Sequence, residues 1–142
     1  MAVEHTASAA WDGDLLSGSG TFSFGSGAAT DVGLTWRARA EDASAGTSPE
    51  ELIAAALAGC FSMALSHGLA QAGTPPTHLD TDARASFQPG VGLTEIALRV
   101  RGQVEGIDEE GFTRAAETAK DNCPVSKALA GNVTLSLDAA LA

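Results

Sequence analysis

The segment SPEELIAAALAGCFSMALSHGLAQAG, residues 48–73, decides the fold. It predicts a long helix in which Ser48 is the N-cap and Pro49 takes the first helical position. Glu51 is placed to complete a capping box with Ser48. The helix is expected to stop at Gly73, because glycine accepts the left-handed conformation that closes helices. Its apolar residues lie nearly all the way round, which is typical of a helix buried on most faces.

The chain has 142 residues, which suits a single domain spanning residues 1–142. One domain of this size can hardly bury so long an apolar helix by itself. We therefore expect a second copy of the chain to help cover it.

Short strands and two further helices are predicted around the long helix. Val32, Leu34 and Trp36 alternate with other residues and favour a strand there. The order of elements is βββ-α-ββ-αα-β, which predicts an α+β fold with antiparallel sheets around a long buried central helix. The expected strands are 3–11, 20–24, 31–39, 79–88, 93–104 and 133–137, and the expected further helices are 108–122 and 123–129.

Charge and hydropathy exclude several classes of function. The formal net charge is -10 with only 8 Lys plus Arg, which argues against nucleic-acid binding because that needs a basic surface. Ser62, Ser66, His67 and Gln71 interrupt the longest apolar run, so no membrane span is expected. The N-terminus shows no export signal, and we therefore expect a cytoplasmic protein.

No metal or other cofactor is expected. Two cysteines cannot form a four-ligand zinc site alone. His5, His67 and His78 lack the spacing of metal ligands and are interpreted as solvated surface side chains.

Cys60 and Cys123 are the residues most capable of chemistry, and their local surroundings differ. Cys123 precedes Pro124 at a helix start, where the helix dipole lowers the pKa of a thiol. Cys60 lies well inside an apolar helix, where burial raises the pKa, so it needs a nearby cation to become a nucleophile. The residues alone favour inert packing for Cys60, and they leave packing and reactivity both open for Cys123.

The sequence resembles the OsmC/Ohr family, and more closely its OsmC branch, over nearly its whole length. The resemblance is carried by five segments: AWDGD at 10–14, GSGT at 18–21, TSPEELIAAA at 47–56, AGCFSMAL at 58–65 and NCPVS at 122–126. It implies the OsmC-like fold.

The resemblance also implies a thiol peroxidase that reduces organic hydroperoxides to alcohols and, to varying degree, reduces hydrogen peroxide. Cys60 corresponds to the peroxidatic cysteine, which becomes a sulfenic acid, and Cys123 corresponds to the resolving cysteine, which then forms a disulfide with it. An external dithiol, in this family often a lipoylated protein, would reduce that disulfide.

The family also uses an arginine and a glutamate. Glu50 matches the glutamate, and Arg39 fits the arginine best, with Arg37 as the alternative. Both arginines would face the same side of the strand predicted at 31–39, because side chains two apart share a face. The arginine would stabilise the thiolate and donate to the peroxide oxygens, and the glutamate would hold the guanidinium in place.

Glu50 and Cys60 are ten residues apart on one predicted helix, which separates them by about 15 Å along its axis. One arginine can hardly bridge that distance within a subunit. We therefore expect an intertwined homodimer with two sites at the interface, in which the glutamate comes from the second copy of the helix.

Two alternatives to a peroxidase remain open at this point. The cysteine pair could serve a redox sensor or a thiol-exchange partner. The chain could also be a non-catalytic member of the fold that binds a small ligand and carries silent cysteines.

Overall fold

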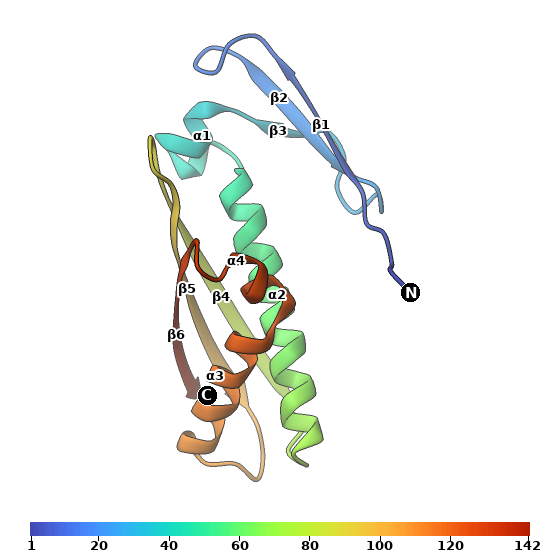
Figure 1. The fold of residues 1–142 in the computed structure, drawn as a ribbon, viewed down its shortest axis with the longest axis vertical. Helices are drawn as coiled ribbons and strands as arrows, with labels where there is room; N and C mark the ends of the chain where they lie inside the picture. Colours follow the sequence, from blue (N-terminus) through green and yellow to red (C-terminus); the bar gives the residue numbers. More distant parts are fainter. The chain divides into compact units, whose positions relative to one another are not determined.

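The computed structural model describes residues 1–142 and divides them into two compact units, residues 1–52 and 53–142 (Figure 1). The first unit holds a small sheet and a short helix, and the second holds another sheet and two further helices. The elements run in the order β1 (Ala7–Asp12), β2 (Ser19–Phe24), β3 (Val32–Leu34), α1 (Trp36–Ala40), η1 (Ala43–Ala45), α2 (Pro49–Gln71), β4 (His78–Gln88), β5 (Gly92–Gln103), α3 (Glu109–Asn122), α4 (Pro124–Leu129) and β6 (Thr134–Leu141).

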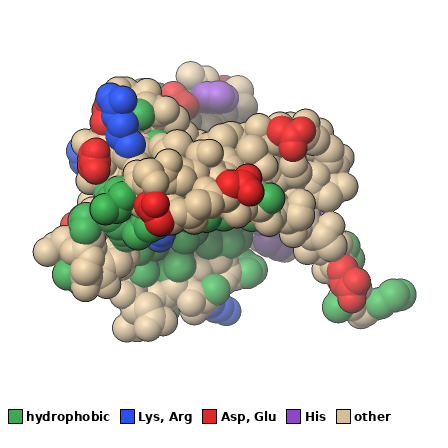
Figure 2. Space-filling model, turned by 90° about the horizontal axis from the view of Figure 1, so that it is seen from above, with side chains coloured by type: hydrophobic (Ala, Val, Ile, Leu, Met, Phe, Trp, Pro, Cys, Tyr) green, Lys and Arg blue, Asp and Glu red, His purple; other side chains and the backbone are tan.

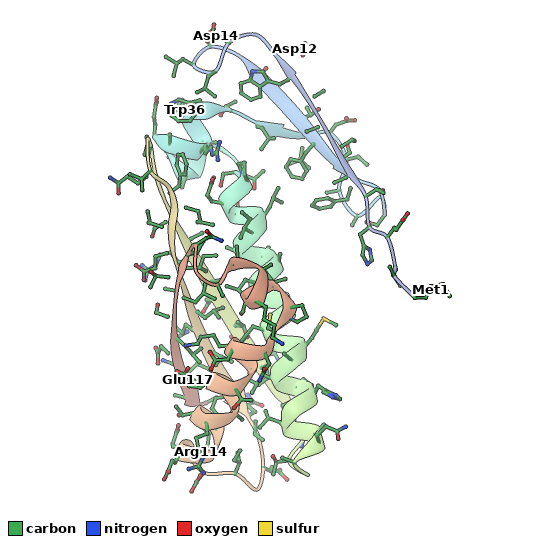
Figure 3. All side chains as sticks on the ribbon, in the orientation of Figure 1. Met1, Asp12, Asp14, Trp36, Arg114 and Glu117 are labelled. Atoms are coloured by element: carbon green, nitrogen blue, oxygen red, sulfur yellow. The ribbon has the colours of Figure 1, made fainter.

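The sheet of the first unit is an antiparallel meander in the order β1-β2-β3. The turn between β1 and β2 is closed by Asp14, whose carboxylate accepts hydrogen bonds from the backbone N–H groups of Leu16 and Ser17, both at 2.9 Å. Figure 3 shows Asp12 and Asp14 at this end of the hairpin. The prediction of three antiparallel strands before the long helix is confirmed.

The third strand is much shorter than predicted, because a helix begins inside the stretch 31–39. Thr35 is the N-cap of α1, and its hydroxyl accepts a hydrogen bond from the backbone N–H of Ala38 at 3.1 Å. A threonine in this role satisfies one of the free N–H groups at a helix start. The strand predicted to reach Arg39 therefore ends at Leu34, and the prediction for residues 35–39 is wrong.

Helix α2 follows the prediction closely at both ends. Ser48 caps it, since its hydroxyl accepts a hydrogen bond from the backbone N–H of Glu51 at 3.1 Å. The helix ends at Gln71, and Gly73 then adopts a left-handed φ of 87°. Proline at positions 75 and 76 cannot continue a helix, because its nitrogen carries no hydrogen to donate.

The sheet of the second unit has the order β4-β5-β6 and is mixed. Strands β4 and β5 form an antiparallel hairpin, but β5 and β6 run parallel. The prediction of antiparallel sheets therefore holds for the first sheet and for β4 with β5, and it is wrong for β5 with β6. A parallel neighbour requires a crossover connection, and α3 and α4 supply it between β5 and β6.

Both α2 and α3 lie on one face of this sheet and enclose the core of the second unit (Figure 1). The core is apolar and draws on both helices and on the middle strand. Its largest fully buried side chains are Phe61, Phe112, Leu57, Leu65, Leu69, Ile96, Val100 and Cys123. The opposite side of α3 faces solvent, where Figure 3 labels Arg114 and Glu117.

Helix α2 is buried along one side only in the single chain, as expected for a helix that one domain of this size can hardly bury by itself. Ala55, Ala56 and Gly59 are exposed, and Met63 is 75% exposed. By length and composition α2 would also suit a membrane span. However, its buried side packs into the core of the second unit, so α2 is a core helix with an uncovered apolar side.

Acidic side chains are scattered over the surface that Figure 2 views and do not gather into one patch. This agrees with the net charge of -10. Such a surface repels polyanions, because it cannot replace their counterions.

Candidate active site

Cys60 lies in the middle of α2, in the second unit, between the buried Phe61 and the exposed Gly59. It is a free thiol and is partly buried. The turns of α2 before and after it carry core residues, including Leu57. Cys60 therefore sits at the edge of the core, and its helix holds it rigidly.

Cys123 lies at the junction of α3 and α4. Its backbone N–H donates to the carbonyl of Ala119 at 2.9 Å, and its own carbonyl accepts from the N–H of Lys127 at 3.0 Å. Pro124 starts α4 because its fixed φ suits the first helical position. Cys123 thus ends one helix and begins the next, and its side chain is completely buried.

The structure brings Cys60 and Cys123 together. Their thiol groups lie close enough to shift each other's pKa, and both are free thiols. The core holds them there: Cys123 belongs to the buried cluster of the second unit, and Cys60 packs against that cluster. Two thiols in this arrangement can exchange a proton, and they can form a disulfide once an oxidant has converted one of them to a sulfenic acid.

The two thiols differ in acidity. The pKa of Cys60 is raised, chiefly by burial and then by the Cys123 thiol, while the backbone N–H of Val125 opposes the shift. Burial also acts to raise the pKa of Cys123, but hydrogen bonds outweigh it and the net direction is downward. Within one chain, the thiolate is therefore favoured on Cys123, which agrees with the interpretation of its position before Pro124.

The hydrogen bonds that lower the pKa of Cys123 come from its closest neighbours. The groups that lower this pKa are, in order of effect, the Cys60 thiol, the backbone N–H of Ser126, the nearby hydroxyl of Ser126 and the backbone N–H of Val125. The groups that act on Cys60 include no cation. The activation that Cys60 needs is thus not supplied by the groups that surround it in the second unit.

Arg39 and Glu50 also come together, in the first unit. The guanidinium donates through Nε to both carboxylate oxygens, at 3.1 and 3.2 Å, and through Nη2 to Oε1 at 2.8 Å. Glu50 is only 6% exposed and stands in the first turn of α2, where the helix dipole favours a negative charge. This pairing fixes the plane of the guanidinium.

The two candidate arginines, Arg37 and Arg39, lie on α1 and not on a strand. Residues two apart on a helix point in nearly opposite directions, so Arg37 and Arg39 do not share a face, and that expectation is wrong. Arg37 pairs with Asp42 at 3.2 Å, and its side chain is largely exposed. Of the two, only Arg39 pairs with Glu50.

An apolar pocket of about 330 Å³ lies beside Arg39 within the first unit. Trp11, Leu15 and Pro49 contribute to its wall, and so does Trp36, which Figure 3 shows on α1. Trp36 was predicted to lie in a strand, and its position on α1 brings it to this wall. No local sequence pattern indicates this pocket, because its lining comes from segments that are separated along the chain.

The structure contains no group of three or more His, Cys, Asp or Glu side chains placed to hold a metal ion. The four candidate residues form two pairs instead, one thiol pair and one ion pair.

Comparisons with known proteins agree with this architecture. The family described as "OsmC-like protein" matches residues 40–138. The chain is 42% identical over 138 residues to the peroxiredoxin OsmC of Escherichia coli strain K12, covering 95% of this chain and 96% of that one. It is 31% identical over 117 residues to the organic hydroperoxide resistance protein OhrA of Bacillus subtilis strain 168, covering 78% and 79%.

Solved structures share the fold. An organic hydroperoxide resistance protein OsmC from Legionella pneumophila superposes with a TM-score of 0.73 at 22% identity, covering 98% of this chain and 99% of that one. The organic hydroperoxide resistance protein OhrB of Bacillus subtilis gives a TM-score of 0.67 at 25% identity, covering 94% and 97%. The similarity in fold therefore extends over nearly the whole chain.

Proposed function

Since the chain belongs to the OsmC-like family, we propose that it is a thiol-dependent peroxidase that reduces organic hydroperoxides to alcohols and also accepts hydrogen peroxide. The observation that carries the proposal is the pair of free thiols of Cys60 and Cys123, which the core of the second unit brings together. In the reducing cytoplasm, where we place the protein, such a pair is more often catalytic than structural.

Cys60 is the peroxidatic residue in this proposal. Its thiolate attacks the terminal oxygen of the hydroperoxide, and the O–O bond breaks. The electron pair of that bond leaves on the alkoxide, which takes up a proton and departs as the alcohol. Cys60 keeps the transferred hydroxyl as a sulfenic acid.

Cys123 resolves that intermediate. Its thiolate attacks the sulfur of Cys60, and the hydroxyl leaves with a proton as water. The product is a disulfide between Cys60 and Cys123. An external dithiol, such as a lipoylated protein, then reduces this disulfide to two thiols and is itself oxidised to a disulfide.

Arg39 is the cation that Cys60 lacks in its own surroundings. A guanidinium stabilises the thiolate and can donate to the peroxide oxygens in a planar fork. Glu50 holds that fork through the contacts of 2.8 to 3.2 Å. Arg39 is preferred to Arg37, because Arg37 pairs with Asp42 and not with Glu50.

The active protein is an intertwined homodimer in this proposal, with two sites at the interface. The uncovered apolar side of α2, around Gly59 and Met63, supports a second copy of the helix as its cover. Glu50 and Cys60 stand ten residues apart on α2, about 15 Å along its axis. The Arg39–Glu50 pair of one chain would therefore serve Cys60 of the other chain.

A mixed dimer tests whether Arg39 of one chain serves Cys60 of the other chain. Chains carrying Cys60→Ser are expected to be inactive alone, and chains carrying Arg39→Ala are expected to keep about one hundredth of the wild-type activity. Unfolded together and refolded, half of their dimers are mixed, and each mixed dimer has one intact site, which gives about a quarter of the wild-type activity. If Arg39 serves Cys60 of its own chain, the mixture stays at or below the activity of the Arg39→Ala chains alone. A fully active monomer in sedimentation would contradict the dimer itself.

The proposed activity is tested by steady-state turnover of an alkyl or fatty-acid hydroperoxide, compared with hydrogen peroxide, with a dithiol and then with a monothiol as reductant. We expect many turnovers with the dithiol and few with the monothiol. Fast oxidation without repeated turnover under every reductant would instead favour a redox sensor. No oxidation at all would indicate silent cysteines and contradict the proposal.

A further inference from the structure

Ser126 carries a buried hydroxyl that the fold does not use. The residue is 2% exposed. Its side-chain oxygen, Oγ, is buried and makes no hydrogen bond in the structure. Other buried or half-buried hydroxyls are satisfied: Ser62, for example, donates to the carbonyl of Ala58 at 2.8 Å. A buried polar group without a partner destabilises the fold, so its presence calls for a reason outside folding.

The position of Ser126 suggests that reason. It follows Cys123 by three residues in the first turn of α4, and its own carbonyl accepts a hydrogen bond from the N–H of Ala130 at 2.9 Å. The backbone is thus fixed, while the hydroxyl hydrogen can rotate. The hydroxyl lies close enough to the Cys123 sulfur to contribute to the lowered pKa of that thiol.

A thiolate is a better hydrogen-bond acceptor than a thiol, because it carries the full negative charge. The Ser126 hydroxyl has no competing acceptor and is shielded from water by its burial. It is therefore unpaired beside the neutral thiol and ready to donate when the charge on the sulfur appears.

We propose that Ser126 is a positioning residue for the reduction of the disulfide: its hydroxyl donates a hydrogen bond to the Cys123 thiolate and so makes Cys123 the sulfur that leaves. This inference rests on the proposed function.

In the step concerned, a thiolate of the external dithiol attacks the Sγ of Cys60. A new S–S bond forms between the reductant and Cys60, and the Cys60–Cys123 bond breaks. Its electron pair goes to the Sγ of Cys123, which departs as a thiolate and receives the Ser126 hydrogen bond. The second thiol of the reductant then attacks the mixed disulfide and releases Cys60, and the reductant leaves as a cyclic disulfide.

The choice of leaving sulfur matters because thiol–disulfide exchange is faster when the leaving thiol is more acidic. Attack at Cys60 also puts the mixed disulfide on the more exposed of the two sulfurs, since Cys123 is completely buried. Ser126 would thus set both the rate and the direction of recycling.

The test compares Ser126→Ala with Ser126→Thr, which keeps the hydroxyl, and with Ser136→Ala, which makes the same change at an exposed serine of β6. Three properties are measured: the melting temperature, the ultraviolet titration of the thiolates, and the rate at which a dithiol reduces the disulfide. The disulfide is formed with diamide, so no peroxide is needed. The rate of Cys60 oxidation by a hydroperoxide is followed separately.

For Ser126→Ala we expect an unchanged or higher melting temperature, because an unpaired buried hydroxyl is lost. We also expect thiolate formation to move up by about one pH unit and reduction by the dithiol to slow about tenfold, with oxidation of Cys60 unchanged. Ser126→Thr should restore titration and reduction, and Ser136→Ala should behave like the wild type.

Wild-type titration and reduction in Ser126→Ala would overturn the inference. So would equal losses of melting temperature, oxidation and reduction that Ser126→Thr does not restore, because these indicate a structural role only. If the wild type does not turn over peroxide at all, the proposed function fails, whereas the titration and the diamide experiment still report on Ser126 itself.

Discussion

Cys60→Ser is expected to abolish peroxide turnover, with a loss of about 10³-fold or more, because a serine hydroxyl at its ordinary pKa is a poor nucleophile. The fold should be retained, since Cys60 is only partly buried and serine is close to cysteine in size. Turnover of an alkyl hydroperoxide with a dithiol measures the loss, and circular dichroism with thermal unfolding checks the fold.

Cys123→Ser is the matched control. It leaves the attacking sulfur in place, so one equivalent of peroxide should still be consumed, and Cys60 should accumulate as a sulfenic acid that mass spectrometry detects as one added oxygen. Repeated turnover with a dithiol should fall strongly. Unchanged turnover in Cys60→Ser would reject the assignment of Cys60 as the peroxidatic residue.

Arg39→Ala is expected to lower turnover by about 10²-fold, the loss typical of removing one donor that stabilises developing charge. The loss of the guanidinium should also move the activity to higher pH, because a cation favours the thiolate of Cys60 and its removal raises the pKa of that thiol. Activity measured from pH 5 to pH 9 with a dithiol checks both effects.

Arg37→Ala is the control for Arg39, since it removes the same side chain two positions away on α1, where it is exposed and pairs with Asp42. It should keep wild-type activity. Glu50→Gln should lose activity less than Arg39→Ala does, because the amide still accepts one hydrogen bond from the guanidinium. Equal activity of Arg37→Ala and Arg39→Ala, with both proteins folded, would contradict the role given to Arg39.

Helix α2 and the hairpin of β4 and β5 could be predicted because their signals are local. Ser48 and Pro49 start α2, Gly73 ends it, and alternation marks β4 and β5. These signals act within a few residues, so the sequence alone carries them.

Two features of the fold could not be predicted from local patterns. The stretch 31–39 alternates like one strand, yet Thr35 caps a helix inside it. Threonine is favoured both at helix N-caps and in strands, so its presence alone does not distinguish the two. The parallel pairing of β6 depends on the crossover through α3 and α4, which no short pattern reveals.

The candidate site was only partly predictable, for the same reason. The position of Cys123 before Pro124 indicated its lowered pKa from neighbouring residues alone. Its partner Cys60 could be named only from the resemblance to a family, because the contact joins segments far apart in sequence. The unpaired hydroxyl of Ser126 left no trace in the sequence, since its burial follows from the packing of the whole unit.

The crossover between β5 and β6 also determines when the two cysteines come together during synthesis. Cys60 leaves the ribosome well before Cys123, and the crossover that carries Cys123 is completed only when β6 pairs with β5. Until then, a sulfenic acid on Cys60 has no neighbouring thiol, and further oxidation to the sulfinic acid is not reversed by ordinary thiols. The two cysteines therefore meet only late in synthesis, and a disulfide between them can form only in a chain whose second unit is complete.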